Sequence, residues 1–447
     1  MRTLSSEDAF FLYIETPEQH QHVVATMILD PANAQESFSI DWLVERYRRE
    51  MEQWPGFSHK LFNTPLSLSP PVLDQDPHFS FRNHIRRISL PAPGTMDQLT
   101  RIVEDIASIQ LDRGRPLWEC WFVSGLEGGR VALVFKSHHC LSDGVHGAEF
   151  MAKLFDRSAA ANTVKHRPGN TDYGHQRNPV WIETYRALRD RWRYQPGYWE
   201  MAKRTHRSLW QRRKVFAQAR SMSDLVPAFL ESGPKLRFNA PITPNRSAAM
   251  SDVSLQEVKR IKRTLGITVN DVVLAACTLA LRDYLIATDD LPDQPLVCYQ
   301  PVSLSLKGKG SRKPDQGNDV GTMAVHLPVQ FASTEALVQG VCDSTQAAKI
   351  VFEQSFENLL QGYIGMLPAS VADWGLKHYL SKQVIRYAPT STNLVISNFP
   401  GPPEPVFLGG ARLEACYVMG PIISGQGPNI TFMSYADRIY FLSLIHI

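Results

Sequence analysis

Two adjacent histidines stand at the centre of the stretch that determines the fold, Lys136-Ser137-His138-His139-Cys140-Leu141-Ser142-Asp143-Gly144. The run before it, Val131–Phe135, is short, rich in β-branched residues and preceded by two glycines, so it predicts a buried strand. Apolar residues at helical spacing follow from Val145 to Phe155. The histidines therefore lie where a strand ends and a helix begins, a position where α/β folds gather functional side chains.

His138 and His139 are predicted to point to opposite faces, because side chains alternate along a strand. An imidazole can take up a proton near neutral pH, since its unperturbed pKa is about 6.5. The residues alone leave open whether these histidines are catalytic or packed in the core. Asp143 stands where an N-cap of the following helix would stand.

A metal site is the rival interpretation, because several potential ligands lie close together in the sequence: His138, His139, Cys140, Asp143 and His146. Their spacing fits none of the usual zinc patterns. The residues alone therefore disfavour a metal site but leave this alternative open.

The chain before the histidines mixes strands and helices. A strand is predicted at Val23–Leu29, and helices at Ile40–Trp54 and Thr100–Leu111. The strand at Cys120–Val123 is followed by a glycine-rich turn, which predicts a hairpin into the histidine-bearing strand. Together these elements form an N-terminal domain over residues 1–178.

Residues 179–234 form a predicted helical linker that is basic and rich in tryptophan. Lysine and arginine outnumber acidic residues between Trp181 and Arg220. This pattern fits a solvated linker whose tryptophans pack on the domains. It equally fits a segment that rests on anionic lipid headgroups.

A second domain is predicted over residues 235–447, again as a mixture of strands and helices, so the fold class is α/β. Its first predicted helix is capped by Ser254 and stopped by Gly266. The other predicted elements are a helix at Thr268–Tyr284, strands at Pro295–Leu306 and Thr322–Val329, a helix at Thr334–Glu357, and strands at Asn393–Ser397 and Ile439–Ile447.

Composition and motif content argue against several functional classes. The net charge of +3 over 447 residues argues against a dedicated nucleic-acid binder. Six scattered cysteines favour a reduced cytosolic protein. The longest apolar run, Val272–Leu281, is shorter than the roughly 20 residues of a membrane span. Motifs of serine hydrolases, P-loop nucleotidases and dinucleotide-binding folds are missing from the sequence.

The sequence resembles the bacterial wax ester synthase/diacylglycerol acyltransferase family of the CoA-dependent acyltransferase superfamily. The segment from His138 to Gly144 fits the superfamily motif HHxxxDG. Further blocks resemble those of the family in the same order: Leu4-Ser5 with Asp8 and Phe10, Glu15-Thr16, Arg115-Pro116-Leu117-Trp118-Glu119, Thr268-Val269-Asn270-Asp271, Pro301-Val302-Ser303-Leu304, Gly317-Asn318 and Ser397-Asn398-Phe399-Pro400-Gly401-Pro402.

The resemblance implies two chloramphenicol-acetyltransferase-like domains, each a mixed β-sheet with flanking helices, and an active-site tunnel between them. It implies acyl-CoA as co-substrate and a diacylglycerol or lipid alcohol as acceptor. It also implies no cofactor and no metal, because a thioester is already activated. The implied product is triacylglycerol or wax ester. The expected location is cytoplasmic, in peripheral contact with a membrane or lipid droplet.

The resemblance also implies the roles of the site residues. His139 is the general base, and His138 and Asp143 hold the loop with Gly144. Asn270 and Asp271 support the site from the second domain. Pro116, Leu117 and Trp118 shape a substrate pocket.

Two alternatives share the superfamily fold: a condensation-type enzyme that uses a carrier-protein thioester, and a non-catalytic protein that binds lipid surfaces. The family continues beyond the final predicted strand into a closing helix. We therefore expect the second domain to be truncated, with a strand edge or apolar surface left uncovered.

Overall fold

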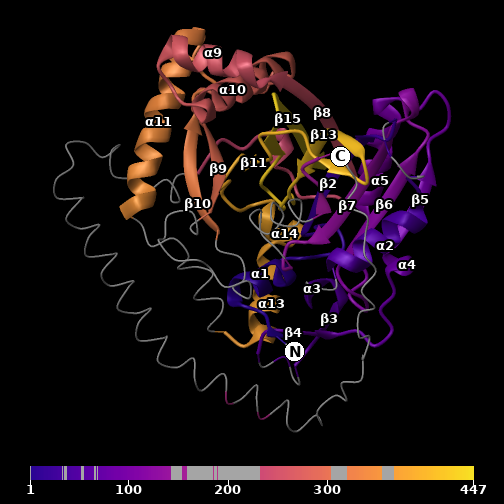
Figure 1. Ribbon diagram of the computed structural model, residues 1–447. Coiled ribbons are helices and arrows are strands. Elements are labelled where there is room, and N and C mark those ends of the chain that lie inside the picture. Colours follow the sequence, from indigo (N-terminus) through magenta and orange to yellow (C-terminus); the bar gives the residue numbers. More distant parts are fainter. Residues whose placement is uncertain are drawn as a thin grey trace.

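The computed structural model describes residues 2–32, 34, 38–51, 55–64, 67, 69–141, 154–158, 185, 189, 232–303, 320–354 and 367–446. In these residues two six-stranded sheets and one three-stranded sheet are flanked by helices (Figure 1). Both six-stranded sheets combine parallel and antiparallel neighbours. The predicted α/β class, with two mixed sheets, is confirmed.

The first large sheet carries the histidines. Its strand order is β12 (Phe407–Leu408), β13 (Ala411–Met419), β2 (His22–Asp30), β7 (Val131–His138), β6 (Trp118–Ser124) and β5 (Ile85–Ser89). All eight residues of β7 are buried, and β7 pairs antiparallel with both β6 and β2. The predicted strand and hairpin are therefore confirmed. The histidines lie at the C-terminal end of β7, which is an interior strand of the sheet.

Helices cover this sheet because their apolar stripes need a partner surface. Helix α2 (Ile40–Met51) buries Leu43 and Tyr47 in the core cluster shared with β7. Helix α5 (Met96–Ser108) buries Leu99 and Val103 in the same cluster, and a capping box at Thr95 begins it. The shorter helices here are α3 (Pro55–Ser58) and α4 (Phe81–His84).

The N-terminal helix α1 (Ser6–Tyr13) lies below this sheet in Figure 1, near a small sheet. The small sheet has the order β1 (Arg2–Thr3), β4 (Val72–Gln75) and β3 (His59–Phe62). Ser5 caps α1 by accepting a hydrogen bond from the backbone of Asp8 at 3.0 Å. This helix supplies one wall of the histidine turn.

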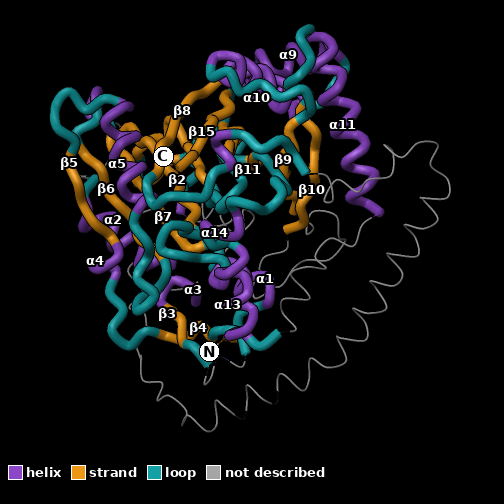
Figure 2. Tube along the Cα trace, turned by 180° about the vertical axis from the view of Figure 1, so that it is seen from behind, coloured by secondary structure: helices purple, strands orange, loops and turns teal. Residues whose placement is uncertain are grey.

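The second large sheet is built from the C-terminal half of the chain. Its order is β10 (Val320–Leu327), β9 (Leu296–Ser303), β11 (Leu394–Pro400), β14 (Asn429–Tyr435), β15 (Arg438–His446) and β8 (Arg246–Ser254). Helices α10 (Val269–Ala287) and α11 (Thr334–Gln354) bury apolar residues in the core cluster that contains β9 and β10 (Figure 2).

Helix α9 (Leu255–Leu265) confirms the caps predicted from the sequence. Ser254 accepts a hydrogen bond from Glu257, and Gly266 ends the helix at φ 69°. A left-handed residue at this position favours glycine because it has no Cβ. Helices α13 (Ala369–Tyr379) and α14 (Lys382–Ile385) complete the described C-terminal half.

The two halves of the chain are joined by strand exchange and by helix packing. Strands β12 and β13 follow residue 400 but extend the first sheet, where β13 pairs with β2. Helix α13 packs on α1. The domain boundaries predicted at 1–178 and 235–447 stay a prediction. With these boundaries, β13 belongs to the second domain although it pairs with β2 of the first.

The expected free edge at the C-terminal strand is not present in β15. This strand pairs with β14 on one side and with β8 on the other, over nine residue pairs from Arg246 to Ser254. Both edges of β15 are therefore paired, while the expected truncation of the second domain stays a prediction.

Several predicted features lie outside the described residues. These are most of the helix predicted at 145–155, nearly all of the linker at 179–234, and the Gly317-Asn318 block. Within the described part, no single helix is long and apolar enough to span a membrane. Helices α9 and α10 together meet that criterion but are bent by 101°.

Candidate active site

The histidine turn is held by the backbones of neighbouring strands. The N–H of His138 donates to the carbonyl of Leu117 at 3.0 Å, and the N–H of His139 donates to the carbonyl of Gln21 at 2.8 Å. The N–H of Leu141 closes the turn on the carbonyl of His138 at 3.0 Å. The peptide positions of both histidines are therefore determined by the segments that immediately precede β6 and β2.

His138 is completely buried, and both of its ring nitrogens face protein groups. Its Nδ1 accepts the backbone N–H of Cys140 at 3.1 Å, and its Nε2 lies 3.5 Å from Oε1 of Glu15. Because Nδ1 accepts a hydrogen bond, Nε2 is the ring nitrogen available to donate, and it faces the carboxylate of Glu15. His138 thus holds the turn by its side chain.

Glu15 is the central acidic group of this cluster. Arg113 donates to Oε2 of Glu15 from Nη2 at 2.6 Å and from Nε at 3.0 Å. His22, on β2, places Nε2 3.5 Å from Oε1 of the same carboxylate. Burial alone would raise the pKa of Glu15, but hydrogen bonding and attraction from His138 and Arg113 outweigh it and lower the pKa to about 2. The carboxylate is therefore ionised at neutral pH.

Sequence reasoning did not identify Glu15 as a site residue. It appeared only within the Glu15-Thr16 block that resembles the family opening. A signal was available, because a glutamate between the apolar helix α1 and a buried strand requires a cationic or hydrogen-bonding partner. That partner lies far away in the chain, on β7 and in the loop before β6.

His139 lies on the opposite side of the turn, as the strand alternation predicts. Its ring stacks on Phe11 of α1, with centroids 4.0 Å apart and planes at 18°. The side chain is partly exposed, in contrast to that of His138. The tandem histidines therefore have different environments, one fully buried and one with solvent access.

A second buried ion pair lies next to the cluster. Lys136 is completely buried, and its Nζ donates to Glu119 at 3.0 Å and to the carbonyl of Ile106 at 2.7 Å at the end of α5. A cation is favoured at a helix C-terminus. Burial, followed by repulsion from Lys136, holds the pKa of His22 well below its ordinary value. His22 is therefore neutral. Burial also lowers the pKa of Lys136, and the neighbouring Glu119 carboxylate opposes that shift.

The segment Pro116–Trp118 is buried. Leu117 is part of a cluster that joins α1 to α13. Trp118 is 1% exposed, donates from Nε1 to the carbonyl of Phe57 at 2.7 Å, and stacks on His84 at 4.7 Å. These contacts place Leu117 and Trp118 in the core that supports the histidine turn. A role in lining a substrate pocket stays a prediction.

Asn270 and Asp271 lie at the start of α10. Asp271 is buried, closes the capping box with Thr268, and accepts a hydrogen bond from Thr345 of α11 at 2.8 Å. Asn270 accepts from Nε2 of Gln300 on β9 at 3.4 Å. Asp271 thus stabilises the helix start that carries Asn270, while the predicted support of the histidine site stays a prediction.

Asp143 and Gly144 lie outside the described residues, so their predicted roles cannot be placed. Among the residues that the structure does describe, no group of three or more histidine, cysteine or acidic side chains is arranged to hold a metal ion.

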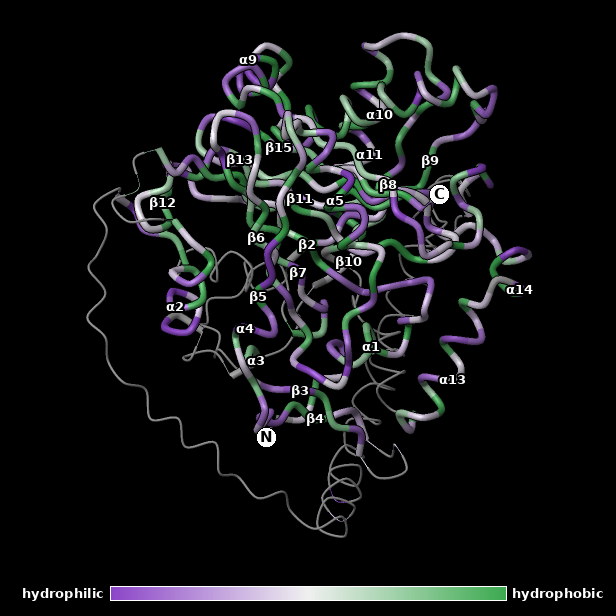
Figure 3. The backbone as a smooth tube through the Cα atoms, turned by 90° about the vertical axis from the view of Figure 1, so that its right-hand side faces the viewer, coloured by the Kyte–Doolittle hydropathy of each residue, from purple (hydrophilic) through white to green (hydrophobic). Residues whose placement is uncertain are grey.

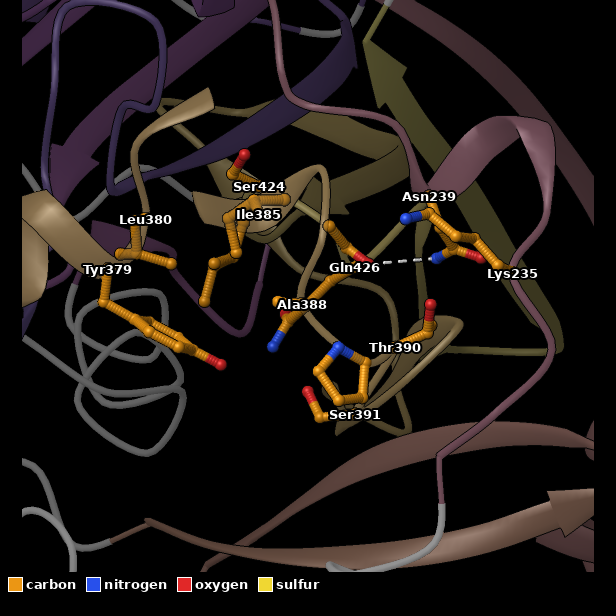
Figure 4. A pocket seen from close by; sticks show the side chains of 13 residues that line it. Lys235, Asn239, Tyr379, Leu380, Ile385, Ala388, Thr390, Ser391, Ser424 and Gln426 are labelled. Carbon is orange, nitrogen blue, oxygen red and sulfur yellow. Dashed lines mark hydrogen bonds between the residues drawn. The ribbon is translucent and has the colours of Figure 1, made fainter. Parts of the chain in front are cut away.

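A cavity of about 70 Å³ lies between the segment after α13 and the loop 423–426 (Figure 4). Its walls include Asn239, Tyr379, Thr390 and Gln426. Ser424, also in its wall, donates its backbone N–H to Oε1 of Gln19 at 2.7 Å. One hydrogen bond thus connects the cavity wall to Gln19. Gln19 lies two residues before Gln21, whose carbonyl accepts the backbone N–H of His139.

Two mixed sheets with flanking helices, and a histidine turn at the end of a buried central strand, define a two-domain acyltransferase of the chloramphenicol-acetyltransferase-like class. Residues 4–273 match the family model described as "Wax ester synthase/diacylglycerol acyltransferase catalytic domain". Residues 316–445 match the model described as "WS/DGAT C-terminal domain". The chain belongs to the wax ester synthase/diacylglycerol acyltransferase family.

Individual relatives agree with this assignment. A putative diacylglycerol O-acyltransferase of Mycobacterium tuberculosis is 31% identical, over 97% of this chain and 84% of that protein. The O-acyltransferase WSD of Acinetobacter baylyi is 28% identical, over 98% of this chain and 91% of that protein. The solved wax ester synthase/diacylglycerol acyltransferase of Marinobacter aquaeolei VT8 matches with TM-score 0.69 and 25% identity, over 100% and 93%. The protein is an acyltransferase, and its family implies an acyl donor and a lipid acceptor.

Proposed function

We propose that this protein transfers a fatty acyl group from acyl-CoA to diacylglycerol, to a long-chain alcohol, or to both, with His139 as general base. The names of similar proteins, a diacylglycerol O-acyltransferase and a wax ester synthase/diacylglycerol acyltransferase, support these acceptors. One observation carries the choice of base. His138 is completely buried, with both ring nitrogens facing Cys140 and Glu15, whereas His139 is partly exposed on the other face.

In the proposed reaction, His139 removes the proton from the acceptor hydroxyl. The oxygen attacks the thioester carbonyl and forms a tetrahedral intermediate. Collapse of this intermediate breaks the carbon–sulfur bond, and the imidazolium returns its proton to the leaving thiolate. A positioned base of this kind typically contributes about 10²- to 10⁴-fold. A thioester is already activated for this attack, so the proposal includes no metal or cofactor.

The remaining residues position this base. His138 and Glu15 hold the turn from the buried side, and Phe11 sets the plane of the His139 ring. Asp143 and Gly144 are proposed to complete the turn. The donor and acceptor are proposed to meet at His139 in a tunnel between the domains, with Asn270 on the far wall and the Pro116–Trp118 segment shaping the pocket.

We further propose that the enzyme works in the cytoplasm in peripheral contact with a membrane or lipid droplet. Its acceptors partition into lipid, and the basic, tryptophan-rich segment 181–220 supports contact with anionic headgroups.

The test is ester formation from labelled palmitoyl-CoA with diacylglycerol or hexadecanol. His139→Ala is expected to lose about 10²- to 10⁴-fold in kcat. His78→Ala, at an exposed histidine away from the turn, is the matched control and keeps the wild-type rate. Ester formation by His139→Ala at the wild-type rate contradicts the assignment of the base. Turnover of a carrier-protein thioester but not of acyl-CoA contradicts the assignment of the donor.

A further inference from the structure

Helix α13 has two apolar faces, and only one of them is covered. Ala369 and Ala372 are buried in the cluster that α13 shares with α1. Val371 and Trp374 are three residues apart and therefore share another face, which is exposed. A surface helix needs one apolar face to pack on its protein. The second face indicates a further contact.

Several large exposed apolar side chains lie along α13, α14 and their flanks. In the described part of the chain this region includes Leu367 (47% exposed), Val371 (46%), Trp374 (68%), Tyr379 (51%) and Tyr387 (84%). Both helices lie at the right-hand edge of the molecule in Figure 3. An exposed group of this kind marks a binding surface.

The charge of the same region is positive. Between residues 367 and 391 the sequence contains Lys377, Lys382 and Arg386 but one acidic residue, Asp373. Asp373 is already paired with Lys377 at 2.7 Å, and Arg386 is exposed beside Tyr387. The surface therefore combines aromatic side chains with cationic charge.

We infer that this α13–α14 surface, defined by Leu367, Val371, Trp374, Tyr379, Arg386 and Tyr387, docks on an anionic lipid layer. The inference rests on the proposed lipid-surface function and identifies where the contact is made. Tryptophan and tyrosine are enriched where protein meets the headgroup region of a bilayer. Lysine and arginine near them are attracted to anionic lipids. A partner protein would not require this combination.

The surface adjoins the cavity described above. Tyr379 belongs to both, and Leu380 and Ile385 line the cavity wall that is built from the same segment (Figure 4). Ser424, whose backbone N–H is hydrogen-bonded to Gln19, lines the same cavity. Docking through α13 would therefore bring lipid close to the segments that hold the histidine turn.

The test is co-sedimentation of the full chain with phosphatidylcholine vesicles, with and without phosphatidylglycerol. Trp374→Ala is expected to weaken vesicle binding about tenfold, because the variant lacks the aromatic ring that docking would bury in the lipid layer. Arg386→Gln is expected to weaken binding about fivefold, and only on vesicles that contain phosphatidylglycerol. The matched control is Ile350→Ala, which removes a 57% exposed apolar side chain on α11 and leaves binding unchanged.

Three outcomes overturn the inference. If Trp374→Ala and Arg386→Gln bind like wild type while the charge removal Arg212→Gln/Arg213→Gln abolishes binding, the basic segment makes the contact. The proposed lipid-surface function then survives without the α13–α14 surface. If wild type binds neither vesicle, that part of the proposed function also fails. If Trp374→Ala changes the oligomeric state in gel filtration and leaves vesicle binding intact, the surface joins copies of the chain. Unchanged thermal melting of the variants confirms that they fold.

Discussion

Replacing Glu15 by glutamine tests the buried network behind the histidine turn. The amide keeps the volume of the side chain but removes the charge that faces Arg113, His138 and His22. It also directs an NH₂ group at the guanidinium of Arg113, which is itself a donor. We expect the variant to be less stable and to hold the turn, and hence His139, less precisely.

The contribution of the Glu15 carboxylate to the free energy of unfolding follows from its pKa. Lowering it from 4.5 to about 2 corresponds to about 3 kcal/mol, at about 1.4 kcal/mol per pKa unit. Because the pKa is lower in the folded state, this contribution is complete above pH 4.5 and is lost as the pH falls toward 2. At pH 3.5 the same relation leaves about 2 kcal/mol.

The assay is urea denaturation of wild type and Glu15→Gln, followed by tryptophan fluorescence at pH 7 and at pH 3.5. The difference in unfolding free energy should be about 3 kcal/mol at pH 7 and should narrow at pH 3.5. Glu127→Gln, at an exposed glutamate in the β6–β7 hairpin, is the matched control with no such difference. A Glu15→Gln protein as stable as wild type, or a gap that does not change with pH, refutes the reasoning.

Two further substitutions and one thiol-labelling measurement test other parts of the structure. Trp118→Ala should lower the unfolding free energy by about 3–5 kcal/mol because it empties an aromatic core site; a loss below 1 kcal/mol in the same denaturation assay, about the size of a surface effect, would contradict the core assignment. Asp271→Asn should cost about 1–2 kcal/mol in thermal denaturation, through the helix cap and the bond from Thr345, and an unchanged melting temperature would show that the cap is dispensable. Burial raises the pKa of Cys120 and Cys416 to about 12, so these thiols should react with Ellman's reagent at pH 8 only after unfolding, and prompt reaction in the native protein would show that the sites are open.

Local pattern was sufficient for elements whose signals lie within a few residues. The run Val131–Phe135 and the glycines before it predict β7 and its hairpin, and Ser254 and Gly266 predict both ends of α9. Alternation along a strand is also local, so it separates the environments of His138 and His139 before any tertiary contact is known.

Other strands carried no comparable signal. Strands β8, β13 and β14 were not predicted. In β8 the first residue is buried and the rest are partly or fully exposed, so its sequence, RSAAMSDVS, has no clear apolar alternation. Its register is determined instead by nine backbone pairs with β15. Strand β13 alternates locally, but nothing in its sequence indicates that it pairs with β2 of the other half of the chain.

The candidate site divides in the same way. A dipeptide of histidines after an apolar run is visible in the primary structure, because strand periodicity and turn chemistry act over neighbouring residues. The difference between the two histidines depends on Glu15, Arg113 and Phe11, which reach them through α1 and the loop before β6. Hydrogen bonds and ion pairs act over a few ångströms in space and carry no trace in sequence spacing. Packing of α1 against the end of β7 therefore decides which imidazole is buried as a support and which is left with access to solvent.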